Sequence, residues 1–200
     1  MTRKKPSERK EEIREAGIKV IAEEGFHDAT TDSIAKVAGV SVGTIYNYFN
    51  NKEEILHYIF EVEREKITDF FTGLTASGLP AEEKIRRFLK RYLGRALKNR
   101  RKSKLLLDEE HRPVKKVSME ILDYSMLLKS CVKELLEAGI SEGSIKGELD
   151  PELVSGMIIG AADSVVVKSS FTDDCPDDVL EGASEEIVET LKRGIFNCEN

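Results

Sequence analysis

The stretch TTDSIAKVAGVSVGTIYNYFNNK, residues 30–52, decides the fold of the N-terminal part of the chain. Apolar residues recur with a helical period over Asp32–Ala38. Gly39 is suited to end that helix, because glycine adopts left-handed backbone conformations without a steric penalty. Ser41 is placed to cap a second helix over Val42–Tyr48. Two short helices around a glycine-containing turn indicate a helix-turn-helix, whose second helix enters the DNA major groove.

Candidate DNA-contacting residues lie on and around this second helix. Small residues at its start, such as Gly43, let the backbone approach DNA closely, and the hydroxyl and amide groups that follow can reach phosphates or base edges. Lys52 adds a positive charge for a phosphate, and Thr31 is expected to cap the preceding helix. The residues expected at DNA are Thr31, Ser41, Val42, Gly43, Thr44, Tyr46, Asn47, Tyr48 and Lys52.

The same stretch resembles the tetracycline-repressor (TetR) family of one-component bacterial regulators. The resemblance covers roughly residues 10–60, and beyond them only the helix layout and the total length agree. It is carried by Thr31, Ile34-Ala35, Ala38-Gly39-Val40-Ser41, Gly43-Thr44, Tyr46, Tyr48-Phe49, Lys52 and Leu56. The resemblance implies a homodimer with an N-terminal DNA-reading domain and a helical C-terminal ligand domain. It also implies that the last two long helices pair across the dimer.

A hydrolase motif overlaps the turn, because residues 39–43 read G-x-S-x-G. A nucleophile elbow needs a strand before the serine and a helix after it, whereas the residues before Ser41 have a helical pattern. Ser41 is therefore interpreted as a helix cap. No phosphate loop, zincin motif or other catalytic set occurs, so neither an enzyme nor a cofactor is expected.

Composition favours a cytoplasmic protein without a metal site. Of the 200 residues 40% are hydrophobic, no apolar run approaches the length of a membrane span, and no signal peptide opens the chain. Cys131, Cys175 and Cys198 have no metal-like spacing, and their odd number favours reduced thiols. His111 stands beside two glutamates, but no further histidine or cysteine is placed nearby.

The net charge of −6 is unevenly distributed. Residues 1–50 hold 8 Lys/Arg and 8 Asp/Glu, so the later residues carry the whole acidic excess. Residues 1–10 alone hold five basic residues and one acidic residue. Nonspecific attraction to phosphates is therefore expected from this arm and from Lys52. A solubilising disordered tail explains the arm alone about as well.

Helical periodicity continues through the rest of the chain, and no strand-like run occurs. Helices are predicted from Ser7 to about Glu24, from Lys52 to about Leu74, over 81–99 and 105–110, from Pro113 to about Ala138, from Pro151 onward, and from about Asp177 to Phe196. The expected fold class is all-α. A three-helix helix-turn-helix domain over residues 1–52 is followed by a helical bundle over 53–200 for ligand binding and dimerisation.

A basic run stands out within this bundle, since residues 84–104 contain eleven Lys/Arg and no Asp/Glu. It could attract an anionic ligand or make a second DNA contact. The interpretation we favour is a solvated face that acidic residues elsewhere complement, such as Asp173, Asp174, Asp177 and Asp178.

Aromatic, Met and Cys side chains of the central helices are candidates for an effector pocket, although ordinary core packing is the better explanation for each alone. The candidates are Phe88, Tyr92, Tyr124, Met126, Cys131 and Met157. The basic run favours an apolar or amphiphilic anion, such as a fatty acyl thioester, over a cation.

The function expected is that of a transcriptional repressor that a small molecule releases from a palindromic operator on double-stranded DNA. A two-fold dimer would place its recognition helices about 34–36 Å apart, or a multiple of that, to reach equivalent half-sites. A ligand-independent DNA-binding or architectural protein is the alternative, and an enzyme is a distant third.

Overall fold

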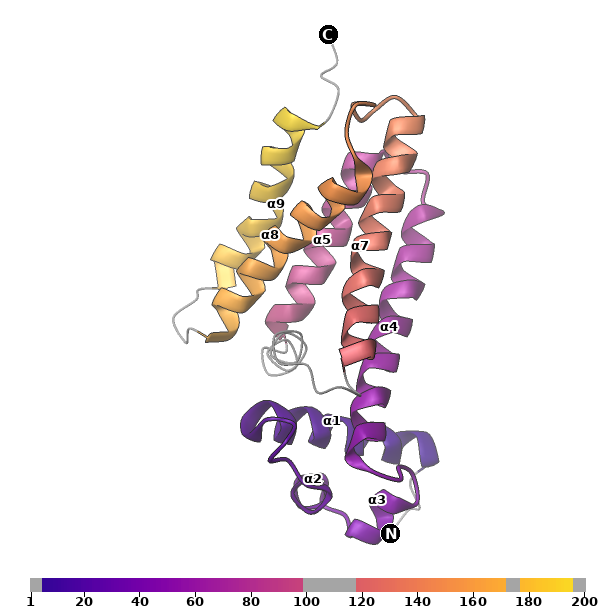
Figure 1. Cartoon of the computed structure of the whole chain (residues 1–200), viewed down its shortest axis with the longest axis vertical. Helices are drawn as coiled ribbons and strands as arrows, with labels where there is room; N and C mark the ends of the chain where they lie inside the picture. The colour runs from indigo at the N-terminus through magenta and orange to yellow at the C-terminus, as the bar shows by residue number, and fades with distance from the viewer. Residues whose placement is uncertain (1–4, 99–117, 172–176, 196–200) are drawn as a thin grey trace.

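The computed structural model describes residues 5–98, 118–171 and 177–195, which form eight helices and no strand. The helices are α1 (Pro6–Glu24), α2 (Thr31–Ala38), α3 (Val42–Tyr46), α4 (Lys52–Thr75), α5 (Ala81–Lys98), α7 (Ser118–Ser141), α8 (Pro151–Phe171) and α9 (Asp177–Gly194). The expected all-α class is confirmed. The helix expected over 105–110 lies outside the described residues, as does the start expected after Pro113. In Figure 1, α1, α2 and α3 gather at one end, and the remaining helices form a bundle at the other.

The three N-terminal helices close around an apolar core of their own. Ile13 of α1, Ile34 of α2 and Ile45 of α3 are each fully buried in it. Gly17 lets α1 approach α4 closely, because a Cβ at this position would lie 2.8 Å from Cγ2 of the buried Ile55. The first helix begins at Pro6, slightly earlier than the expected start at Ser7.

Local capping explains where α2 begins. Thr30, and not the expected Thr31, is its N-cap: the Thr30 hydroxyl accepts a hydrogen bond from the Ser33 amide at 3.1 Å. The Ser33 hydroxyl lies 3.1 Å from the Thr30 amide in return, which completes a capping box. The expectation for Thr31 was wrong because both neighbouring threonines can cap, and only Thr30 has the extended backbone of a cap.

The turn between α2 and α3 follows the expectation from sequence. Gly39 adopts the left-handed conformation, with φ 67° and ψ 35°. Ser41 caps α3, and its hydroxyl accepts from the Thr44 amide at 3.2 Å. The α3 helix ends at Tyr46, two residues before the expected end. Because Ser41 follows a helix and a turn rather than a strand, the nucleophile-elbow geometry is absent here.

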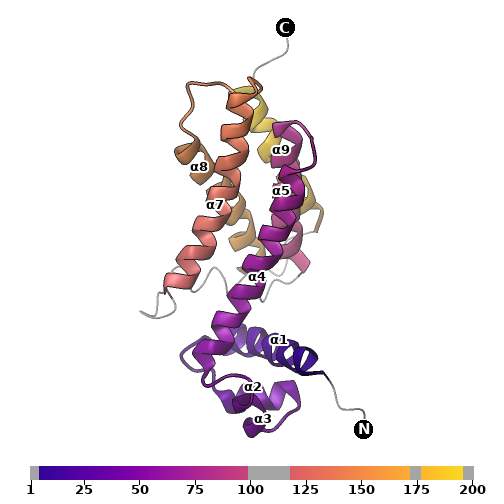
Figure 2. The same ribbon diagram turned by 90° about the vertical axis from the view of Figure 1, so that its right-hand side faces the viewer.

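Helix α4 belongs to two cores. Its first half packs Ile55 and Phe60 against α1–α3, and its second half packs Ile67 and Leu74 into the bundle. The domain boundary expected after residue 52 therefore coincides with the start of a helix that the two cores share. Figure 2 shows α4 running from the helix-turn-helix into the bundle without interruption.

The bundle is built from α4, α5, α7, α8 and α9, with α7 packed on α8 and α5 packed on α9. Phe88, Val132 and Ile159 are fully buried in its core. Asp150 caps α8 as expected, because its carboxylate accepts from the amides of Glu152 at 2.9 Å and Leu153 at 3.3 Å. Within the described residues, no helix is both long enough and apolar enough to span a bilayer.

Candidate DNA-reading and effector sites

Helix α3 has one buried anchor and an otherwise open surface. Ile45 is fully buried, whereas 54% of Tyr46 is exposed. Of the nine residues expected at DNA, Ser41, Gly43, Tyr46 and Asn47 are exposed, and Thr31, Val42, Thr44, Tyr48 and Lys52 are partly buried. The turn and α3 therefore present hydroxyl and amide groups, together with bare backbone, to the outside.

Neighbouring hydroxyls hold this surface in place. The Thr31 and Tyr46 side-chain oxygens lie 3.5 Å apart, and those of Ser41 and Thr44 lie 2.9 Å apart. Gly43 sits in an open environment, because a Cβ there would meet only the Ser41 hydroxyl, at 3.9 Å. The fold of the chain itself therefore does not require glycine at this position.

Lys52 lies within hydrogen-bond distance of three backbone carbonyls, an arrangement that differs from the expected phosphate contact. Its ammonium donates to the carbonyl oxygens of Phe26, His27 and Ala29 at 2.7, 2.9 and 2.9 Å. It also lies 4.7 Å from the centre of the Phe26 ring. An ammonium has three N–H donors, and these carbonyls use all of them. These contacts give Lys52 a structural role, because they fix the α1–α2 connection to the start of α4. The expected phosphate contact of Lys52 stays a prediction.

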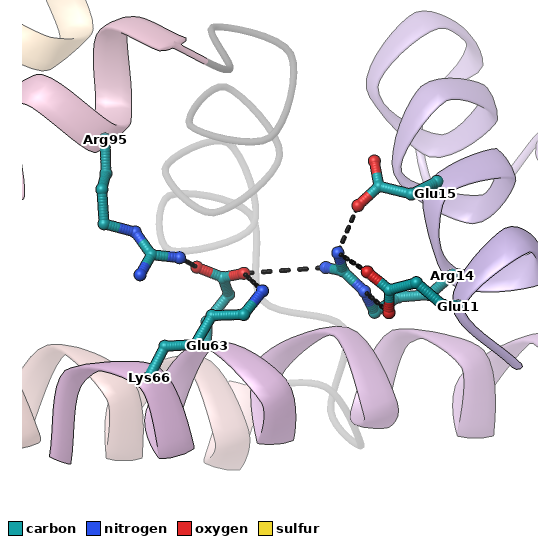
Figure 3. A network of polar contacts seen from close by, with 6 residues as sticks. All are labelled: Glu11, Arg14, Glu15, Glu63, Lys66 and Arg95. Carbon is teal, nitrogen blue, oxygen red and sulfur yellow. Dashed lines mark hydrogen bonds and ion pairs between the residues drawn. The ribbon is translucent and has the colours of Figure 1, made fainter. Parts of the chain in front are cut away.

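Sequence reasoning missed a polar bridge that joins α1, α4 and α5 (Figure 3). Glu63 of α4 is 3% exposed, and its carboxylate accepts from Arg95 of α5 at 2.8 Å. Its other oxygen lies 3.4 Å from the Lys66 ammonium and 3.6 Å from Nη1 of Arg14 on α1. Arg14 and Glu63 are charged residues within the apolar stripes of α1 and α4, and these interruptions were the signals in the sequence that could have indicated the bridge.

The Arg14 guanidinium is held by carboxylates on two helices. Burial by itself lowers the pKa of Arg14, but the hydrogen bond to Glu11 and the charges of Glu15, Glu11 and Glu63 outweigh burial and raise it. Nη1 of Arg14 is buried and has no hydrogen-bond acceptor among the residues that the structure describes, because the Glu63 oxygen at 3.6 Å is too distant. The contact between α1 and α4 is therefore an ion pair that has room to shorten.

The six residues expected in an effector pocket separate into three groups. Phe88 and Cys131 belong to the bundle core, and burial raises the pKa of the Cys131 thiol to about 12. Tyr92 and Tyr124 are partly buried. Met126 and Met157 are 56% and 73% exposed, so their assignment to an interior pocket is corrected. Helical period alone does not distinguish a core face from an apolar outer face.

The two tyrosines make polar and aromatic contacts between helices. The Tyr92 hydroxyl of α5 donates to the Asp163 carboxylate of α8 at 2.5 Å. Tyr124 of α7 packs on both cores and meets the Phe60 ring edge-on, with 6.2 Å between ring centres. Burial, followed by the charge of Glu63, raises the pKa of Tyr124. Tyr124 therefore lies beside the polar bridge, where the two cores meet.

Among the described residues, only part of the basic run is paired with acidic side chains. Arg86 pairs with Glu82 and Glu83 of its own helix and with Glu185 and Glu189 of α9. The side chains of Asp173, Asp174, Asp177 and Asp178, expected as its partners, lie outside those that the structure describes. Within the described residues, no acidic side chain pairs with Lys90 or Arg91.

The described residues contain no cluster of three or more side chains that could ligate a metal ion. His111, the weak metal candidate of the sequence, lies outside them.

Two family models match the chain, and together they include both parts of this architecture. The model described as "Bacterial regulatory proteins, tetR family" matches residues 13–59, and "Tetracyclin repressor-like, C-terminal domain" matches residues 78–167. The chain belongs to the TetR family. It is a DNA-binding transcriptional regulator, as the resemblance over residues 10–60 implied.

Two relatives of this TetR-family chain match three-quarters of its length or more. The fatty acid metabolism regulator protein of Bacillus subtilis (strain 168) is 29% identical, over 93% of this chain and 95% of that protein. The uncharacterized HTH-type transcriptional regulator YhgD of the same organism is 30% identical, over 76% of this chain and 79% of that protein.

Two solved structures have the same fold at 29% identity. The fatty acid degradation regulator FadR from Bacillus halodurans superposes with a TM-score of 0.83, covering 92% of this chain and 98% of that one. FadR from Bacillus subtilis in complex with stearoyl-CoA gives a TM-score of 0.78, covering 90% of this chain and 96% of that one.

The geometry of Lys52 makes a prediction that separates its two possible roles. Lys52→Ala should lower the free energy of unfolding by about 1.5–3 kcal/mol, because three carbonyls lose a charged donor. Denaturant unfolding measures this loss, with Lys36→Ala, an exposed lysine of α2, as the control. The salt dependence of operator binding should not change. A phosphate contact would instead show as unchanged stability and a salt slope about 0.9 lower.

Proposed function

We propose that this regulator is a repressor whose effector is a long-chain fatty acyl-CoA and whose recognition element is the exposed surface of α3. The observation that carries the proposal is the match, over nine-tenths of the chain, to FadR crystallised with stearoyl-CoA. The protein would act as a binding protein rather than an enzyme, and it would work in the cytoplasm, where its operator is.

Helix α3 is the part of the chain that we place in the DNA major groove. Its exposed backbone at Gly43 and the polar groups of Tyr46 and Asn47 are the contacts that the groove and the flanking phosphates accept. Lys52 is omitted from this set, because carbonyls use its donors. Thr31 and Ser41 support the surface through their contacts with Tyr46 and Thr44.

An acyl-CoA suits the C-terminal bundle on chemical grounds as well. The bundle core is apolar, and it contains the polar Tyr92–Asp163 pair between α5 and α8. The outer face of α5 carries Lys90 and Arg91, which have no acidic partner among the described residues and can therefore attract an anionic headgroup. Phe88 and Tyr92 on the inner side of the same helix remain our candidates for contact with the acyl chain.

We place the dimer interface on α8 and α9. One face of α8 is exposed although it consists of apolar and small residues: Leu153 is 67% exposed and Met157 is 73% exposed, and Gly160 and Ala161 continue that face. No heavy atom lies within 4 Å of a Cβ built at Gly156 or Gly160. A smooth apolar face of this kind is suited to another helix, and a second copy of the chain is the partner that a palindromic operator requires.

The placement of α3 in the major groove predicts an effect of Gly43→Ala. Stability should rise by up to about 1 kcal/mol, because alanine favours the helix and has room. Operator affinity should fall about tenfold or more, because the added methyl group separates backbone from DNA. Gly73→Ala is the matched control, since Gly73 is an equally open helical glycine on α4. Equal operator affinity of the two variants in fluorescence anisotropy would refute the placement.

The effector assignment predicts release of DNA by long acyl chains. Palmitoyl-CoA or stearoyl-CoA at micromolar concentration should weaken operator binding by about 5–150-fold, the usual range of allosteric coupling. Acetyl-CoA at the same micromolar concentration should have a much smaller effect, because it buries little apolar surface and therefore occupies less of the protein. The operator can be selected from a random DNA pool with the purified protein. If no acyl-CoA alters its binding, the ligand-independent alternative is favoured.

The dimer interface predicts a contrast between two exposed methionines. Met157→Glu should convert the dimer to a monomer at micromolar concentration, because a charge would be buried in the interface without a partner. Met126→Glu on α7, 56% exposed in the single chain, should leave the dimer intact. Sedimentation velocity measures both. A wild-type monomer, or a Met157→Glu dimer, would remove α8 from the interface.

A further inference from the structure

We propose that the groove between α4 and α5 binds the phosphate groups of an organic phosphate, and that its occupancy is communicated to the DNA-binding helices through Arg95 and Glu63. The inference rests on the proposed function in one respect: the expected source of the phosphates is the headgroup of the acyl-CoA effector.

The groove is a shallow hollow of about 370 Å³ along the outer face of α5. Spacings of three and four residues bring its α5 side chains onto one stripe. The lining consists of Phe70 from α4 and of Arg87, Lys90, Arg91, Gly94 and Arg95 from α5. Gly94 leaves the space open, because no heavy atom lies within 4 Å of a Cβ built there. Four basic side chains thus surround a gap created by one glycine.

Among the described residues, two of the four basic side chains of the groove have a carboxylate partner. Arg87 binds Glu83 at 2.6 Å, and Arg95 binds Glu63 at 2.8 Å. Lys90 and Arg91 have no carboxylate partner among the described residues. Two cations beside an opening, without a carboxylate partner in the described part of the chain, suit a multiply charged anion.

Arg91 supplies an observation that is independent of the charge count. Its guanidinium lies over the Phe70 ring, with 4.4 Å between the guanidinium carbon and the ring centre. Its Nε is buried, and no described residue supplies a hydrogen-bond acceptor for it. Buried N–H donors are almost always paired in proteins, so an unpaired one marks a place where an acceptor belongs. Phosphate oxygens are the acceptors that arginine binds best.

The position of the groove argues against DNA as the source of these phosphates. Helices α2 and α3 lie on one side of α1, and the bundle that contains α5 lies on the other side in both ribbon views (Figures 1 and 2). A duplex seated on α3 therefore faces away from the groove. A small organic phosphate remains as the ligand.

Arg95 joins the groove to the polar bridge. It lines the groove and also holds one oxygen of the buried Glu63. The other Glu63 oxygen lies 3.6 Å from Nη1 of Arg14, a buried donor without an acceptor among the described residues. A phosphate bound in the groove pulls the Arg95 side chain away from Glu63. The Glu63 carboxylate can then move toward the Arg14 guanidinium and shorten the 3.6 Å distance between them. Because Arg14 is on α1, which packs on α2, this closure shifts the helix-turn-helix relative to α4.

The groove is tested by calorimetric titration of the full-length protein with inorganic pyrophosphate and with coenzyme A. Gly94→Leu fills the gap, and Gly73→Leu places the same side chain on another open helical glycine. Both ligands should bind Gly94→Leu about tenfold more weakly or worse, and should bind Gly73→Leu as they bind the wild type. Lys90→Gln should weaken them too, in contrast to Lys129→Gln on α7. If pyrophosphate and coenzyme A bind Gly94→Leu as tightly as Gly73→Leu, the groove is not the phosphate-binding site.

The coupling is tested with Glu63→Gln, which keeps the shape of the side chain and removes its charge. Coenzyme A should bind this variant as tightly as the wild type or more tightly, because Arg95 is released. Saturating coenzyme A should weaken operator binding by the wild type but not by Glu63→Gln. Arg95→Gln tests the same link if Glu63→Gln does not fold, as judged by thermal melting. If coenzyme A weakens operator binding by the folded variant as much as it does by the wild type, the signal does not pass through Arg95 and Glu63.

Palmitoyl-CoA identifies the source of the phosphates. If Gly94→Leu weakens its binding relative to Gly73→Leu, the effector headgroup occupies the groove. If the two variants differ toward pyrophosphate but not toward palmitoyl-CoA, the groove binds a separate organic phosphate. If pyrophosphate binds the wild type but palmitoyl-CoA does not, the proposed acyl-CoA effector is wrong. The proposed phosphate site between α4 and α5 is then still supported.

Discussion

The shared carboxylate of Glu63 is the interaction through which the DNA-reading end and the bundle of this molecule depend on each other. A carboxylate that is 3% exposed is costly unless cations compensate it, and Arg14, Lys66 and Arg95 do so from three helices. Removing one partner of a buried pair typically costs about 3–5 kcal/mol. Helices α1 and α5 are therefore linked in energy, although they have few direct contacts. A ligand that changes either side of this bridge changes the other.

The link matters because the recognition helix cannot hold its own position. Helix α3 has five residues, far fewer than an isolated helix needs in water. Ile45 anchors it in the N-terminal core, and Lys52 ties the α1–α2 connection to α4 through three carbonyls. As a result α3 follows α1 and α4 as one body. In our proposal, a small change where Arg14 meets Glu63 displaces the surface of α3 that we place at DNA.

Short-range patterns were the predictable part of this molecule. Gly39, Ser41 and Asp150 determine turns and caps within a few residues, so the helix-turn-helix and the start of α8 follow from local chemistry. The role of Lys52 did not, because its acceptors are carbonyls more than twenty residues away. The bridge of Arg14, Glu63 and Arg95 likewise depends on how three helices meet. Met126 and Met157 show a further limit, since an apolar position can belong to an outer face.

The central claim, that the bundle controls the placement of α3 through Glu63, is tested by measuring the distance between the two α3 helices of a dimer. Spin labels at the exposed Asn47 of each protomer allow this by double electron–electron resonance. Palmitoyl-CoA should move the wild-type distance away from the value in the operator complex, about 34–36 Å or a multiple for equivalent half-sites. It should leave the distance in Glu63→Gln unchanged. An unchanged wild-type distance at a palmitoyl-CoA concentration that abolishes operator binding would contradict the account.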